Sequence, residues 1–368
     1  MLVTAAYRVG LFGYLAHPGL TRESPHGASG NYGLLDQIAA LGWVQRNIAA
    51  FGGDPRRVTA FGVSAGSASI ALLLTAPSAT GLFQRAILES PGAFRPLASL
   101  GEAERAGLAL GPDIDRLRQM PADELVTKTS LLVPKIRGLT APRLLRPIRD
   151  GWVICEDERE AFNAGRFHVM PTIVGGNADE GMTLTATWPI RTPADLRELA
   201  MTNFPQAFDA VGSLYPATRD DEVRGRVAEM FADTQFNFGV WQLARAMSAC
   251  TPQTWRYLFL RRCPGRLDGP NHGEEVPYVF NTLGLALPGQ ETAPFDGVDE
   301  NVAEAMQAAW VRFAATGDPN GAELPCWPAY RAEDDRYLAF DDAIRAGKNW
   351  RRRQMDFLDS YYTRMKEV

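Results

Sequence analysis

The stretch Arg57-Val58-Thr59-Ala60-Phe61-Gly62-Val63-Ser64-Ala65-Gly66 decides the fold that this sequence predicts. Its first five residues include β-branched and aromatic side chains typical of a short strand. The Gly-x-Ser-x-Gly pattern allows a sharp turn, and the Ala-rich segment 67–75 predicts a helix after it. Taken alone, the pattern also fits an ordinary turn serine. Between a strand and a helix, Ser64 is a candidate nucleophile, and the Ala65 N–H is a candidate donor to an oxyanion.

The surrounding sequence alternates predicted strands and helices. Apolar residues recur at helical spacing over 33–51, and the segment 51–55 (FGGDP) ends that helix. The ranges 171–175 and 255–260 are β-branched or aromatic runs that enter Gly-containing loops, and 1–14 suits a buried strand entering a Gly-rich loop. This alternation predicts a mainly parallel sheet whose functional groups gather at the carboxyl ends of the strands.

A serine nucleophile needs a base to accept its proton, and two histidines follow Ser64 in the chain. His168 precedes the strand at 171–175 and so belongs at the wrong end of the sheet, which favours a structural role. His272 lies in the loop 269–275 after the strand at 255–260. Its order and placement make His272 the candidate base.

The base in turn needs an acid that holds its tautomer and stabilises the imidazolium. The segment 175–181 (GGNADEG) follows a predicted strand between the serine and the histidine, and it contains Asp179 and Glu180. The residues alone leave both carboxylates open as candidates.

Composition excludes several classes of protein. The 368 residues are 46% hydrophobic with a net charge of −5, which predicts a soluble globular protein and argues against nucleic acid as a partner. There is no apolar run of membrane-spanning length and no signal-like start, so we expect a cytoplasmic protein without a membrane span. No metal site is predicted, because the four cysteines lack metal-ligand spacing. We expect these cysteines to be reduced, with a disulfide between Cys250 and Cys263 as the alternative.

Two further groups of residues have a structural interpretation. The basic run 351–353 is predicted to lie on the solvated face of a terminal helix. Five aromatic residues either belong to the core or line an apolar pocket: Trp188, Phe231, Phe236, Phe238 and Trp241.

Several motifs resemble those of the carboxylesterase and cholinesterase family. They are GNYGLLDQ (30–37), ALGWVQRNI (40–48), FGGDP (51–55), DEG (179–181), PYVF (277–280), TGDPN (316–320) and WPAY (327–330). The resemblance implies an α/β-hydrolase fold with a mainly parallel sheet flanked by helices. It also implies a single domain over residues 1–368, with a helical excursion at roughly 182–250.

The resemblance also implies a function and a set of roles. Ser64, Glu180 and His272 become nucleophile, acid and base of a serine carboxylic-ester hydrolase, with Asp179 as the second candidate for the acid. The substrate is then a small-molecule ester and no cofactor is needed; the sequence predicts no oligomeric state. Arg8 and Asp36 are expected to form a structural ion pair.

The alternatives are a non-catalytic relative or inactive fragment of the same fold and, less favoured, a peptidase or amidase, because the same turn serves any acyl transfer.

Two departures from the family pattern stand out. Val63 replaces the glutamate that usually precedes the nucleophile, which removes a buried carboxylate. The sequence also contains no HGGG-type segment that would supply further oxyanion donors. We therefore expect the chain to begin after that segment and after the first strands of the sheet, and to be a weak esterase by itself.

Overall fold

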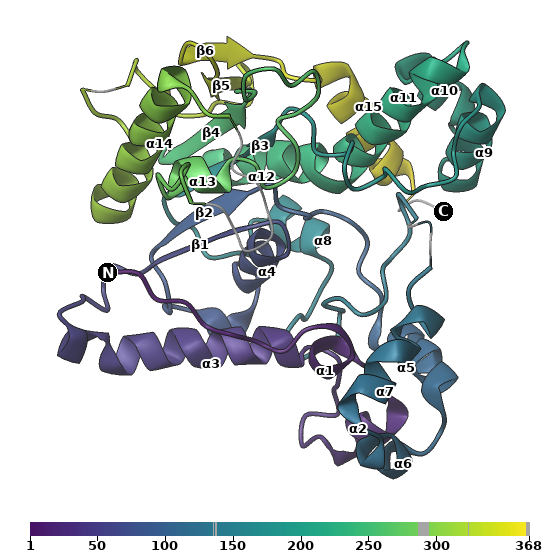
Figure 1. Cartoon of the computed structure of the whole chain (residues 1–368). Coiled ribbons are helices and arrows are strands. Elements are labelled where there is room, and N and C mark those ends of the chain that lie inside the picture. The colour runs from purple at the N-terminus through teal and green to yellow at the C-terminus, as the bar shows by residue number, and fades with distance from the viewer. Residues whose placement is uncertain (135, 137, 286–293, 323, 366–368) are drawn as a thin grey trace. The chain divides into compact units, whose positions relative to one another are not determined.

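The computed structural model describes residues 1–368 except 135, 137, 286–293, 323 and 366–368 (Figure 1). The chain forms two compact units, which we call the helical unit and the sheet unit. The helical unit consists of Met1–Val58, Ala71–Gln84 and Arg95–His168. The sheet unit consists of Thr59–Ile70, Arg85–Phe94 and Val169–Val368. The single domain over residues 1–368 stays a prediction.

The sheet unit contains a sheet of six described strands in the order β1-β2-β3-β4-β5-β6. The strands are β1 (Thr59–Val63), β2 (Arg85–Glu89), β3 (Thr172–Asn177), β4 (Thr254–Phe259), β5 (Arg336–Phe340) and β6 (Arg345–Lys348). The first five strands are parallel to their neighbours, and β6 is antiparallel to β5. The predicted, mainly parallel α/β sheet is confirmed.

Helices follow most of the strands. Those of the sheet unit are α9 (Pro193–Asn203), α10 (Phe208–Leu214), α11 (Asp220–Ala232), the π-helix η5 (Asp233–Asn237), α12 (Phe238–Cys250), α13 (Val276–Val279), α14 (Gly297–Thr316) and α15 (Arg352–Arg364). Helix α4 (Ala65–Leu73) begins in the sheet unit directly after β1. The predicted excursion at 182–250 contains α9 to α12, between β3 and β4.

The helical unit contains short helices and the longer α3. Its α-helices are α1 (Gly10–Tyr14), α2 (Pro18–Glu23), α3 (Tyr32–Asn47), α5 (Leu100–Gly107), α6 (Ile114–Gln119), α7 (Ala122–Thr127) and α8 (Glu158–Asn163). Its 3-10 turns are η1 (Ile48–Phe51), η2 (Pro77–Ala79), η3 (Leu108–Leu110) and η4 (Lys128–Leu131). Gly52, with φ of +83°, ends the α3–η1 helix, as FGGDP predicted.

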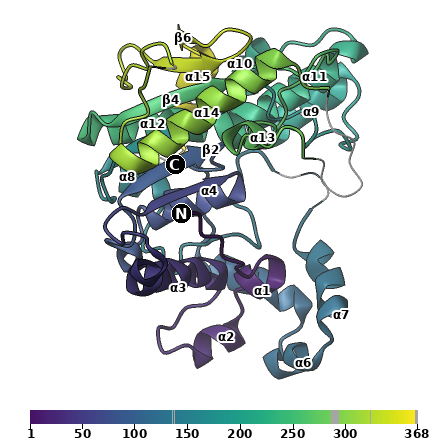
Figure 2. The same cartoon turned by 60° about the vertical axis from the view of Figure 1, so that its left-hand side comes forward.

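The main core of the sheet unit lies between one face of the sheet and α14. Side chains that alternate along β4, including Trp255, Tyr257 and Phe259, pack against Trp310 and Phe313 of α14. Figure 2 shows α14 crossing in front of these strands. Because residues of period two share one face of a strand, β4 presents this aromatic row to α14 and, through Phe259 and Tyr278, to α13. The core fixes the strands whose carboxyl ends carry the candidate site.

The start of the chain differs from its predicted strand. Leu2 and Val3 are 57% and 44% exposed, and no strand of the described chain pairs with residues 1–9. A strand needs a neighbour to satisfy its backbone N–H and C=O groups, so an apolar pattern alone does not form one. The predicted pair of Arg8 and Asp36 is confirmed: two side-chain hydrogen bonds of 2.7 and 2.9 Å join them, and the Arg8 backbone N–H donates a third.

We predict that the Arg8–Asp36 pair stabilises the helical unit modestly, because both side chains are partly exposed to water. A double-mutant cycle with Arg8→Met and Asp36→Asn should give a coupling free energy of about 0.5–1 kcal/mol in urea unfolding. The control cycle uses Arg56→Met and Asp54→Asn in the same unit. These two side chains share one contact of 3.3 Å, the Arg56 side chain is 89% exposed, and the Arg56 backbone N–H also donates to Asp54. Equal coupling in the two cycles would contradict the assigned role.

Candidate active site

Ser64 lies in a strained turn between β1 and α4. Its φ of +57° is in the left-handed region that residues other than glycine seldom adopt. The turn is held by hydrogen bonds from the Ser64 N–H to the Glu89 carbonyl at 2.9 Å and from the Ala68 N–H to the Ser64 carbonyl at 2.8 Å. A Cβ on Gly62 would lie only 3.2 Å from the Gly66 backbone, so Gly62 lets the helix approach the strand closely. The Gly-x-Ser-x-Gly pattern thus forms the strand-turn-helix that the sequence predicted.

The first residue of α4 is Ala65, which is exposed to solvent. The N–H groups of a first helical turn have no acceptor within the helix. The Ala65 N–H is therefore available to an oxygen atom brought to Ser64, and the positive end of the helix dipole favours negative charge there.

The Glu180 carboxylate is completely buried and receives donors from three segments. Its Oε1 accepts hydrogen bonds from Ser90 Oγ at 2.5 Å and from the Asn177 N–H at 2.7 Å. Its Oε2 lies 2.5 Å from Nδ1 of His272. A Cβ on Gly176 would lie 2.8 Å from Oε1, so this glycine leaves room for the carboxylate. The chain thereby fixes Glu180 at the carboxyl end of β3.

The loop that carries His272 lies beside the loop that carries Glu180. The Asp179 N–H donates to the Pro270 carbonyl at 3.1 Å, and Asn177 Nδ2 donates to the Asn271 carbonyl at 2.7 Å. An ionised carboxylate only accepts hydrogen bonds, so the contact with Glu180 places the proton of a neutral His272 on Nδ1. Nε2 is then left as the acceptor for a nucleophile's proton.

The competing residues have other contacts. Asp179 Oδ1 accepts from the Met182 N–H at 3.2 Å, and Oδ2 accepts from the Gly269 N–H at 3.3 Å. Partial burial raises the pKa of Asp179, although these backbone donors oppose the rise. In the helical unit, His168 Nε2 lies 3.0 Å from the Ala76 carbonyl. The structure therefore joins Glu180, and not Asp179, to His272.

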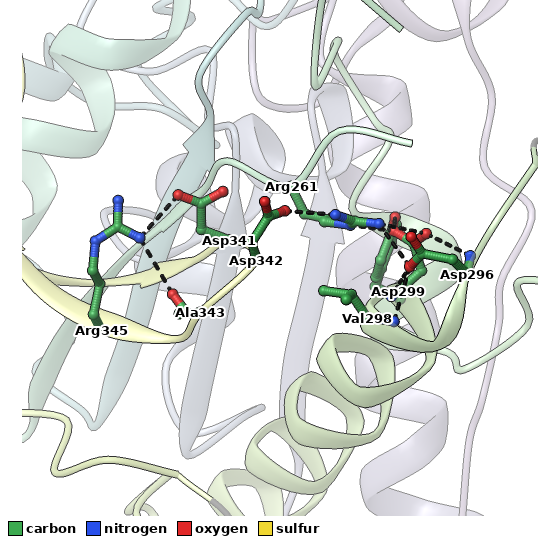
Figure 3. Close-up of polar contacts among 9 residues, drawn as sticks. Arg261, Asp296, Val298, Asp299, Asp341, Asp342, Ala343 and Arg345 are labelled. Atoms are coloured by element: carbon green, nitrogen blue, oxygen red, sulfur yellow. Dashed lines mark hydrogen bonds and ion pairs between the residues drawn. The ribbon is translucent and has the colours of Figure 1, made fainter. Parts of the chain in front are cut away.

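An ion-pair network around the buried Arg261 and Asp299 anchors the start of the histidine loop (Figure 3). Arg261 follows β4 and donates to Asp299 at 2.6 and 2.9 Å, to Asp296 at 2.8 Å and to Asp342 at 2.5 Å. Burial raises the pKa of Asp299, but Arg261 and Tyr278 donate to its carboxylate and hold that pKa below its usual value. The network ties the end of β4 to the first turn of α14.

Two further carboxyl groups are buried near Glu180, and sequence reasoning missed both. Glu89 ends β2 and accepts a hydrogen bond from Trp310 Nε1 at 2.7 Å; burial raises its pKa to about 7. Glu275 accepts from Asn177 Nδ2 at 2.5 Å, and burial, with the charges of Glu89 and Glu180, raises its pKa well above the usual value. Below about pH 7 these shifts favour the neutral forms of both groups, close to Glu180. The signal in the sequence was Glu89 ending an apolar strand and Glu275 lying three residues after the histidine.

The remaining sequence interpretations have mixed outcomes. The prediction of a solvated face is wrong for Arg351, whose side chain forms an ion pair with the buried Asp233 at 2.6 Å. It is correct for Arg353, which is exposed. The five aromatic side chains are all buried, and among them Phe236 contacts His272. All four cysteines are free thiols, so Cys250 and Cys263 are not bonded. Within the described residues, no cluster of His, Cys, Asp and Glu is arranged to hold a metal ion, and no helix has the length and apolar character to cross a membrane.

We predict that Glu89 makes the protein less stable as the pH rises. Its pKa is about 7 in the folded chain against an ordinary value of 4.5, so its contribution to stability is complete below 4.5 and is lost as the pH rises through 7. The stabilisation that Glu89 loses over this pH range is on the order of 3 kcal/mol. Urea unfolding at pH 5 and pH 8 should show a smaller pH dependence for Glu89→Gln, which keeps an acceptor for Trp310. Glu198→Gln, at an exposed position, is the control, and an unchanged slope in Glu89→Gln would refute the assignment.

Known proteins resemble this chain along most of its length. The sequence model described as Carboxylesterase family matches residues 1–358. The chain is 43% identical over 352 residues to Fumonisin B1 esterase of Sphingopyxis macrogoltabida, covering 95% of this chain and 65% of that protein. It is 33% identical over 356 residues to Para-nitrobenzyl esterase of Bacillus subtilis (strain 168), covering 94% of this chain and 70% of that protein.

A third relative is Carboxylesterase 5A of Felis catus, which is 30% identical over 391 residues, covering 97% of this chain and 68% of that protein. The chain thus spans about two thirds of the length of these relatives. A match over nearly all of this chain identifies it as a member of the carboxylesterase family.

Proposed function

We propose that this chain carries the catalytic residues of a serine hydrolase that cleaves small carboxylic esters through an acyl-enzyme. The observation that supports this most is the 2.5 Å contact between His272 Nδ1 and the buried Glu180 carboxylate, in the unit that also holds Ser64 in its strained turn. A buried carboxylate that orients an imidazole is the arrangement that general-base activation of a serine requires.

In the proposed acylation step, Ser64 Oγ attacks the ester carbonyl carbon while His272 Nε2 takes the hydroxyl proton. The imidazolium that forms keeps its Nδ1–H on Glu180. The Ala65 N–H donates to the oxygen that becomes negative. As the C–O bond breaks, the Nε2 proton moves to the leaving alcohol, and the acyl group remains on Ser64.

Deacylation repeats the proton transfers with water. His272 Nε2 takes a proton from water, the hydroxyl adds to the acyl carbon, and the proton returns to Ser64 Oγ as the carboxylic acid leaves. The chain's own side chains supply every proton transfer in this scheme, and we propose no cofactor. The names of two relatives, Fumonisin B1 esterase and Para-nitrobenzyl esterase, support an ester as the substrate. The cytoplasmic location stays a prediction.

We predict that Ser64→Ala and His272→Ala each lower the turnover of p-nitrophenyl acetate by about 10⁴-fold or more, because triad members act as a unit. The assay uses a preparation that hydrolyses this ester, together with labelling by a fluorophosphonate probe. Ser67→Ala and His168→Ala are matched controls: Ser67 Oγ has no hydrogen-bond partner in the described chain, and His168 contacts a backbone carbonyl. Comparable turnover in the site variants, or labelling of Ser64→Ala at the parent's rate, would rule out the assignment.

We predict that the two adjacent carboxylates differ sharply in their effect on turnover. Glu180→Gln should lower kcat by about 10³- to 10⁴-fold, because an amide opposite Nδ1 favours the wrong tautomer. Asp179→Asn, whose side chain accepts only from backbone N–H groups, should lower kcat by less than about tenfold. The opposite ranking would transfer the acid role to Asp179.

Substrate choice is tested by comparing p-nitrophenyl acetate, butyrate and octanoate with fumonisin B1. Hydrolysis of esters but not of the matching p-nitroanilides would support an esterase over an amidase. Hydrolysis of both at similar kcat/KM would overturn that preference.

A further inference from the structure

The imidazole of His272 is covered on one face by Phe236. The two ring centroids are 4.4 Å apart and the rings are inclined by 30°. Phe236 is 7% exposed, and the side chain of His272 is 13% exposed. An aromatic face at this distance restricts rotation of the imidazole and attracts it when it is positively charged. Phe236 therefore contacts the group that the proposed reaction protonates and deprotonates.

Phe236 reaches His272 from a wide turn in a long helix. Helices α11 and α12 are continuous through the π-helix η5, Asp233–Asn237. Phe231 and Phe236 are five residues apart, yet their ring centroids are 6.1 Å apart. In an α-helix such residues point about 140° away from each other, so a regular helix would not bring the two rings together. The π-turn redirects the helix so that Phe236 meets the imidazole while Phe231 packs behind it.

A buried carboxylate clamps this turn. Asp233 begins η5 and is fully buried. It accepts hydrogen bonds from Arg351 Nε and Nη2 at 2.6 and 2.7 Å, from Tyr215 at 2.7 Å and from Asn237 Nδ2 at 2.8 Å. Asn237 is the last residue of η5, so its bond joins the two ends of the turn. Burial and the charge of Asp233 raise the pKa of Tyr215 well above its usual value, which keeps the phenol as a donor.

Arg351 links Asp233, and with it the π-turn, to the C-terminal part of the sheet unit. It directly precedes α15, and its φ of +52° lies in the left-handed region. Asp233 without Arg351 would be a buried carboxylate lacking its only cationic partner among the hydrogen bonds described above, which is strongly unfavourable. The ion pair thus favours the backbone path that places Asp233 inward and, three residues later, Phe236 against His272.

We propose that Phe236 is a positioning residue for His272 and that the Asp233–Arg351 ion pair acts through the π-turn to hold it there. The catalytic part of this inference rests on the proposed esterase function; the contact between the rings does not. Phe236 keeps the imidazole plane aligned so that Nδ1 stays on Glu180 during both proton transfers. Small errors in the orientation of a catalytic group cost rate without a matching loss of substrate binding.

The first test compares Phe236→Leu and Phe236→Tyr with Phe238→Leu. Phe238 is a fully buried residue of the same helix whose ring packs near Trp241 and Tyr362. Phe236→Leu should lower kcat by about 10- to 100-fold with KM changed less than about twofold, and Phe236→Tyr should restore most of the loss. Phe238→Leu should change stability but not kcat. Equal kcat in Phe236→Leu and the parent, or equal losses in Phe236→Leu and Phe238→Leu, would overturn the positioning role.

The second test is independent of esterase activity. The ring current of Phe236 should shift the proton signals of the His272 imidazole upfield in an NMR spectrum. Only four histidines are present, so the His272→Gln variant assigns those signals. The upfield shift should disappear in Phe236→Leu and shrink in Arg351→Met, while Arg353→Met, at an exposed position of α15, should leave it unchanged.

The outcomes separate the two proposals. A shift that survives Phe236→Leu refutes the contact itself, whether or not the protein is an esterase. A shift that survives in folded Arg351→Met refutes the role of the ion pair; if that variant does not fold, Arg351→Lys replaces it with the same readout. Loss of the shift without loss of kcat refutes positioning. Full activity in Ser64→Ala would instead refute the proposed function.

Discussion

The Glu180 carboxylate is fully buried and therefore needs hydrogen-bond donors from the protein, and the rest of the site supplies them. An unpaired buried charge is strongly destabilising, whereas donors placed by the fold make it stable. The donors come from Ser90 after β2, from Asn177 at the end of β3 and from His272 in the loop after β4. Parallel pairing makes this possible, because it puts the carboxyl ends of successive strands at one edge of the sheet. The same edge presents Ser64, since Val63 of β1 is in register with Glu89 of β2.

The other buried carboxyl groups complement Glu180. If Glu89, Glu180 and Glu275 were all ionised, three negative charges would share a low-dielectric interior with one imidazole. Burial instead raises the pKa of Glu89 and Glu275, so that the neutral forms of these two are favoured below about pH 7, while Glu180 receives the donors. A carboxylate that precedes the nucleophile is absent here because of Val63. The additional buried carboxyl groups of this site are therefore Glu89, at the end of β2, and Glu275, in the segment after His272.

Local sequence patterns predicted the parts of the structure whose causes are local. The Gly-x-Ser-x-Gly turn depends on Gly62 and on the helix that follows it, both visible within a dozen residues. The segment 1–14 failed as a strand because strand formation depends on a partner and not only on apolar residues. The residue types alone did not separate Asp179 from Glu180, since only the fold decides which carboxylate faces the imidazole; the family resemblance favoured Glu180. Phe236 was one of five aromatics left open between core and pocket, and its contact with His272 was not predicted, because helical periodicity does not reveal a π-turn.

Through the π-turn, Arg351 influences the position of His272 although it is not in contact with it. Arg351 reads in the sequence as part of a basic surface run, yet its guanidinium is mostly buried against Asp233. A buried ion pair is weak evidence for net stability, because desolvation offsets most of the attraction; its clearest use is to specify one arrangement over another. Here the arrangement specified is a helix with a wide turn, which is less favourable than a regular helix and needs such support. The contact between Phe236 and His272 depends on this wide turn. The packing of the candidate base therefore depends on the C-terminal segment, because Arg351 supports the turn through Asp233.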